Sequence, residues 1–118
     1  MKLEIVKIHE KGKQDAEYVE LKAKEACTLS DYILSDTTYI SPTTISNKLR
    51  HVHWFTPKNL AKGDYVFLRT GKGVDTSHKN RAGTTTYVIY WGLGTPVWNN
   101  TGDAGILIEI NDRQTMKA

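Results

Sequence analysis

Apolar residues alternate with polar ones along most of this chain. Residues 18–24 (YVELKAK) are the clearest case, with Val19, Leu21 and Ala23 separated by single charged residues. A β-strand sends successive side chains to opposite faces, so it places the three apolar groups together and the charged groups on the other side. The period of two therefore predicts a half-buried strand, and its recurrence restricts the chain to folds built from strands.

Six further segments show the same composition of Tyr, Val, Ile, Thr and Trp, which is typical of strands. They are residues 3–8, 32–35, 52–55, 65–69, 86–91 and 106–110. Ile5 and Val6 are adjacent, and a β-bulge would reconcile them with the alternation. Turn residues separate the segments, and Gly63 is one that can take a positive φ. The pattern predicts an all-β fold, an antiparallel sandwich or barrel of about seven to nine strands.

Two stretches lack this rhythm. Residues 37–50 are rich in Ser, Thr and Asn, and we interpret them as a long connection with room for one small strand. The segment from Gly71 to Thr85 holds three glycines, three cations and almost no apolar residue, which predicts a mobile surface loop. Long loops in compact domains are often functional, so this loop is a candidate site.

The length of 118 residues suits one domain, expected over residues 1–113 with a short tail at 114–118. The single cysteine, Cys27, excludes an internal disulfide and is expected to be a small buried group at a strand end. No apolar run approaches the roughly 18 residues of a membrane span, so we expect no membrane insertion. The chain as written is expected to be cytoplasmic, or extracellular or at the cell surface if it is a module of a longer exported protein.

Four segments, in order along the chain, resemble the lamin-tail domain family, immunoglobulin-like β-sandwiches at the ends of animal nuclear lamins and in many bacterial proteins. They are residues 17–21 (EYVEL), 29–36 (LSDYILSD), 55–65 (FTPKNLAKGDY) and 99–107 (NNTGDAGIL). The resemblance implies an immunoglobulin-like sandwich that acts as a non-enzymatic interaction or adaptor module. Residues 22–26 depart from the family's usual turn, and residues 71–85 are an insertion individual to this chain.

Packing and turns account for most of the residues that carry the resemblance. Six bulky side chains are expected to fill the space between the sheets, namely those of Tyr18, Leu21, Leu34, Phe55, Leu60 and Tyr65. Asp36, Asn99 and Asp103 are expected to accept hydrogen bonds from nearby backbone amides.

A histidine pair is the weak candidate for metal binding. His51 and His53 are two residues apart in a predicted strand, so both should project from one face, with His78 or Asp75 available as a third ligand. The alternative is a pair of solvent-facing histidines beside a Trp54 that points to the apolar side. We expect neither a metal nor any other cofactor.

Catalytic motifs are missing from the sequence. It contains no Gly-x-Ser-x-Gly elbow, no His-Glu-x-x-His and no Gly-x-x-x-x-Gly-Lys segment. We therefore expect a protein that is not an enzyme.

Nucleic-acid binding is the alternative function. Residues 26–98 contain eight Lys and Arg against four Asp, a surplus that can favour anionic partners. The candidate contact residues are Lys48, Arg50, Arg69, Lys72, Lys79 and Arg81, with Trp54, Tyr87, Tyr90 or Trp91 for stacking.

Protein binding is the leading prediction. An open sandwich has edge strands that can accept an added strand, and its loops cluster at each end. Tyr39, Trp91 and Trp98 lie near predicted loops and would suit as anchors, because aromatic residues carry much of the energy of an interface. The sequence does not identify the protein partner.

Overall fold

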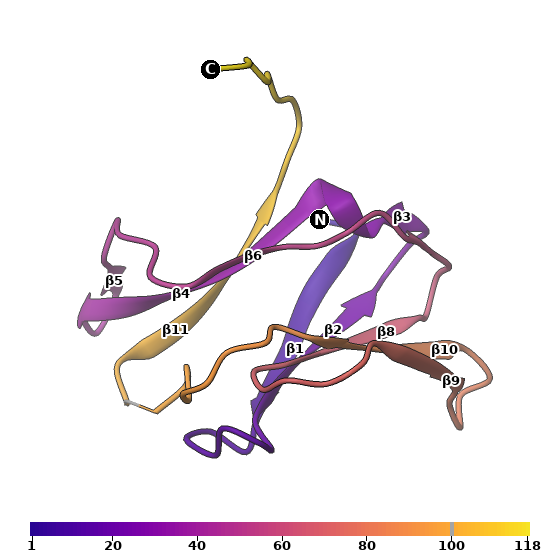
Figure 1. Cartoon of the computed structure of the whole chain (residues 1–118), viewed down its shortest axis with the longest axis horizontal. Coiled ribbons are helices and arrows are strands. Elements are labelled where there is room, and N and C mark those ends of the chain that lie inside the picture. Colours follow the sequence, from indigo (N-terminus) through magenta and orange to yellow (C-terminus); the bar gives the residue numbers. More distant parts are fainter. Residues whose placement is uncertain (100) are drawn as a thin grey trace.

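A computed structural model describes residues 1–99 and 101–118, and in them the chain is an all-β sandwich (Figure 1). Eleven strands form within these described residues, more than the seven to nine predicted. They are β1 (Leu3–His9), β2 (Tyr18–Ala23), β3 (Cys27–Thr28), β4 (Tyr32–Ser41), β5 (Thr44–Ile45), β6 (Val52–Trp54), β7 (Asn59–Leu60), β8 (Tyr65–Arg69), β9 (Thr76–Lys79), β10 (Thr85–Tyr90) and β11 (Asp103–Glu109). A 3-10 turn, η1 (Leu29–Asp31), joins β3 to β4.

The strands form two main sheets. The first has the order β1-β2-β8-β10-β9, and in the second β4 pairs with β11, β5 and β6. The short strands β3 and β7 form a separate antiparallel pair. All the pairings are antiparallel except that of β8 with β10, so the prediction of a purely antiparallel fold was wrong at this one pair.

Several local predictions are confirmed. The register of β1 against β2 shifts between Ile5 and Lys7, which is the bulge that the adjacent apolar residues predicted. Gly63 has a φ of 89° and turns the chain into β8. Of the predicted Asn99–Asp103 turn, Asn100 lies outside the described residues.

The core consists of the inward-facing side chains of both sheets. Val19, Leu21 and Ala23 are fully buried, as the alternation predicted. Tyr18 and Tyr65 were expected in the core and instead lie half-buried on the outer face of the first sheet. Tyr18 lies on the same face of β2 as the polar residues of that strand. β8 pairs with β2 in a register that places Tyr65 on this outer face as well. Tyr32 is buried in the core, with only 1% of its surface exposed.

Residues 71–85 are partly a strand, which corrects the predicted mobile loop. β9 pairs antiparallel with β10, and its four residues are all exposed. Gly73 allows the chain to pass close to Tyr90, since a Cβ there would lie 2.5 Å from the ring. The segment is therefore a hairpin edge of the first sheet.

Glu17 ties three segments together at the end of this sheet. Its carboxylate is fully buried and accepts hydrogen bonds from the Gly12 amide (3.1 Å), the Thr70 hydroxyl and the Val97 amide (2.8 Å). These donors come from the β1–β2 turn, the end of β8 and the segment before β11. The first residue of the EYVEL motif therefore has a structural role.

Candidate functional site

The two predicted histidines do share a face, and that face turns toward the core. The rings of His51 and His53 approach Trp91 with centroids 6.4 and 5.9 Å away, and His53 also contacts Phe55 edge to face. His51 Nδ1 lies 3.0 Å from Asp36 Oδ1, which also accepts the His51 amide. Trp54 projects outward with 48% of its surface exposed, so the expectation that Trp54 would point to the apolar side was wrong.

The metal candidates do not meet a third ligand. Within residues 1–99 and 101–118 no group of three or more His, Cys, Asp or Glu side chains could hold a metal ion. His78 stands opposite Thr86 on the outer face of the first sheet, and Asp75 accepts a hydrogen bond from the Tyr90 amide. His53 packs against Phe55 and Trp91, whereas His51 lies beside Asp36 with 43% of its side chain exposed.

Burial of His53 makes the stability depend on pH. Removal from water lowers the pKa of His53 below its usual 6.5, while the carboxylate of Asp75 opposes this change. The unfolded chain then binds more protons than the native one, so the free energy of unfolding should fall as the pH drops below 6.5. Urea unfolding from pH 6.5 downward should show this fall, and His53→Gln should flatten it. An equal flattening by the exposed control His78→Gln would contradict the assignment.

The predicted basic residues do not form one surface. Arg69 lies opposite Tyr90 and Lys79 opposite Thr85, so the two stand at opposite ends of β10, about 17 Å apart at the rise of a strand. Lys72 and Arg81 are exposed on either side of β9. Lys48 and Arg50 belong to the other sheet's connections, where Arg50 lies 3.7 Å from an Asp103 carboxylate oxygen.

The predicted aromatic anchors are mostly enclosed. Trp98 has only 2% of its surface exposed, which corrects its assignment as a contact residue. Trp91 is half-buried and packs against Trp98, with ring centroids 6.5 Å apart. Both tryptophans lie between the sheets. Their position near predicted loops in the sequence therefore did not mean that they are exposed. Only Tyr39, of the three proposed anchors, is largely exposed.

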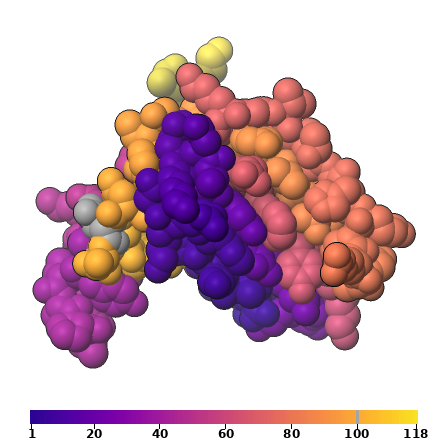
Figure 2. Space-filling model, turned by 90° about the horizontal axis from the view of Figure 1, so that it is seen from below, coloured from indigo at the N-terminus to yellow at the C-terminus, as the bar shows by residue number. Residues whose placement is uncertain are grey.

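Tyr39 belongs to an apolar projection that the sequence prediction missed. We call residues 38–49 the β4–β5 arm, and Figure 2 shows it as the magenta lobe that stands away from the rest of the molecule. Four large apolar side chains on it are exposed, those of Tyr39, Ile40, Ile45 and Leu49, with Ile40 at 69%. The sequence feature that could have indicated this projection is the adjacent pair Tyr39 and Ile40 within a Ser- and Thr-rich stretch.

Hydrogen bonds hold the arm in shape. The Thr37 hydroxyl is within hydrogen-bond distance of the Ser46 and Lys48 carbonyl oxygens, at 3.0 and 2.9 Å. The Ser46 amide donates to the Thr38 carbonyl, and the Tyr39 amide donates to Gly102 beside β11. The apolar side chains are therefore presented by an ordered hairpin.

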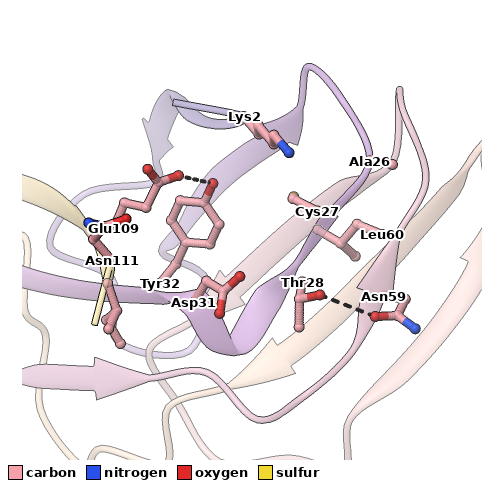
Figure 3. Close-up of a pocket in the computed structure, with 11 residues that line it drawn as sticks. Lys2, Ala26, Cys27, Thr28, Asp31, Tyr32, Asn59, Leu60, Glu109 and Asn111 are labelled. Atoms are coloured by element: carbon pink, nitrogen blue, oxygen red, sulfur yellow. Dashed lines mark hydrogen bonds between the residues drawn. The ribbon is translucent and has the colours of Figure 1, made fainter. Parts of the chain in front are cut away.

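A polar pocket lies at one end of the sandwich (Figure 3). It has a volume of about 610 Å³ and is lined by Lys2, Cys27, Asp31, Tyr32, Asn59 and Glu109, among others. The Tyr32 hydroxyl donates to Glu109 Oε2 at 2.6 Å, and burial raises the pKa of Tyr32 well above 10. Burial also raises the pKa of the Cys27 thiol, which keeps it protonated and unreactive near neutral pH. Burial therefore favours the protonated form of both groups.

No family model matches this chain, and no curated protein matches it. The described part of the chain also has no helix of the length and apolarity that a membrane crossing requires.

Proposed function

We propose that this protein is a non-enzymatic interaction module of the lamin-tail kind and that it binds a protein partner through the β4–β5 arm. The observation that carries the proposal is the exposure of Tyr39, Ile40 and Ile45 on an ordered hairpin. Tyr39 and Ile45 are direct partners across the β4–β5 pair and so lie side by side. Neighbouring apolar side chains that project into solvent are typical of a contact site, because leaving them in water costs free energy that binding recovers.

The edges formed by β9, β1 and β11 are protected in ways that the arm is not. β9 presents only the polar side chains of Thr76, Ser77, His78 and Lys79, and β1 carries a bulge next to Lys7. Polar residues, lysines and bulges all discourage a second chain from pairing with an edge. β11 packs against β1, where Gly105 lies beneath Ile5 and Ile8. Of these four edges, the arm is thus the best suited to a partner.

Charge indicates the chemistry of that partner. Lys48 lies within the arm and Arg50 follows directly after it, and residues 37–63 contain no Asp or Glu. An apolar protein surface bordered by carboxylates would match both features, since complementary charge speeds association and suppresses wrong partners.

Site-specific photo-cross-linking in cells tests the proposal. A photoreactive amino acid at position 40 should capture one acidic protein that the same group at position 74 does not. Val74 is the matched control, because it is an apolar side chain with 81% of its surface exposed and lies before β9, away from the arm. Capture of the same proteins from both positions would show that apolar exposure alone is responsible.

Self-association is the competing outcome, and sedimentation of the purified chain separates it. The proposal expects a monomer over the working concentration range. A dimer that Ile40→Asp dissociates would mean that the arm binds a second copy, and it would contradict the proposed partner.

A further inference from the structure

The outer face of the first sheet carries a stack of aromatic rings. His9 and Tyr18 stack with centroids 4.4 Å apart, and Tyr18 lies 4.8 Å from Phe67. These spacings are close to the roughly 4.8 Å that separates neighbouring strands. His9 and Tyr18 are direct partners across β1 and β2, whereas Phe67 lies diagonally from Tyr18, because Tyr18 pairs with Arg69 of β8. The three rings therefore form one row of contacts from β1 through β2 to β8.

The stack ends at β10, where the next rung is absent. Thr86 and Val88 of β10 stand opposite Tyr65 and Phe67, and neither is large enough to continue the row. A groove of about 340 Å³ lies over Thr86, and Val88 is not part of its lining. Tyr65 and Phe67 line it together with Thr86, and Arg81 of the β9–β10 turn also lines it. The groove is thus next to the last ring of a stack and has room for one more planar ring.

One cation, Arg81, lines the groove, and two more lie over aromatic rings of the same face. Arg81 is exposed on its turn, the Lys22 ammonium lies 5.5 Å from the Tyr65 ring centre, and the Arg69 guanidinium lies 5.6 Å from that of Tyr18. The one carboxylate that lines the groove, Glu20, lies 2.7 Å from His9 Nε2. This part of the face therefore combines a ring-sized space with an excess of positive charge.

We propose that this groove binds a base of single-stranded nucleic acid. The base stacks on Phe67 as the next rung of the row, and the Arg81 guanidinium lies near its other face. Lys22 and Arg69 contact the neighbouring phosphates. Stacking on aromatic side chains together with cations along the backbone is the general mode of single-strand binding. A duplex is excluded because its base faces are already stacked on one another.

This site differs from the basic loop predicted from the sequence and does not depend on the β4–β5 arm. Arg69 and Arg81 are the only residues shared by the basic residues predicted from the sequence and the cations near this groove. The groove is on the first sheet, whereas the arm extends from the second. A failure of one proposal therefore leaves the other unaffected.

Fluorescence anisotropy with the whole chain tests the proposal. The probe is a labelled single strand of mixed sequence and about ten nucleotides, within the span of known single-strand sites. Phe67→Leu and Arg81→Ala should each weaken binding about fivefold or more, and added salt should weaken it further. Arg113→Ala is the matched control, because Arg113 lies 4.8 Å from the Trp54 ring centre, on the other sheet, and it should leave the affinity unchanged.

Any one of the following results would overturn the proposal. They are no binding at low salt, equal binding of the duplex, and an equal loss with Arg113→Ala. A free mononucleotide that binds as tightly as the strand would also overturn it, since the neighbouring phosphates would then contribute nothing. Arg81 is exposed on a turn, so its variant tests the site even if Phe67→Leu disturbs the fold.

Discussion

Replacing Glu17 with alanine is expected to remove about 3 kcal/mol or more from the free energy of unfolding. The change leaves the Val97 amide and the Thr70 hydroxyl without their acceptor, and both lie in the buried end of the sandwich. Each buried donor left unsatisfied costs about 1–3 kcal/mol. Because small domains have only about 5–15 kcal/mol in total, urea unfolding of Glu17→Ala should show a midpoint far below that of the wild type.

Glu17→Gln should destabilise the protein less than alanine does. It keeps one oxygen as an acceptor but turns an amide toward the remaining donors. Glu25 is exposed, so Glu25→Ala controls for the loss of a carboxylate alone and should change stability by no more than about 0.5 kcal/mol. Equal effects of the changes at positions 17 and 25 would contradict the structural role of Glu17.

Trp98→Ala is expected to cost about 3–5 kcal/mol, the usual range for deleting a large buried aromatic side chain. Trp98 is enclosed by Trp91 and by β11, where Gly105 lies against the indole. Trp54→Ala deletes the same group from an exposed position and should cost about 1 kcal/mol at most. Thermal and urea unfolding of both variants measure the difference.

Trp98→Phe is expected to cost less than half as much as the alanine change. The Trp98 indole N–H is buried and finds no hydrogen-bond partner among the described residues, so phenylalanine removes an unsatisfied donor while it keeps most of the packing. A phenylalanine variant as unstable as the alanine one would show that the N–H has a partner.

Alternation in the sequence located the long strands because each has one buried face. It missed β3 and β7, which are two residues long and too short to show a period. It also missed β9, whose four side chains are all exposed and polar, so that neither face carries an apolar signal. The parallel pairing of β8 with β10 depends on the path of the chain around the sheet, which local pattern does not encode.

The candidate sites were harder to predict than the sheets. Tyr65 and Phe67 alternate with buried Val66 and Leu68, so the run of four apolar residues already indicated that both faces of β8 are apolar. Because Tyr18 and Tyr65 were assigned to the core, the row of rings on the outer face was not predicted. The spread of the basic residues over two sheets could be known only once the strand register was established.

Binding of a partner through the β4–β5 arm can be measured as the affinity of the captured protein for purified variants. We predict that Ile40→Asp weakens binding by at least about 30-fold, the size of a hot-spot loss of about 2 kcal/mol, while Val74→Asp leaves it unchanged. Equal affinities for Ile40→Asp and the wild type would mean that the arm does not bind this partner.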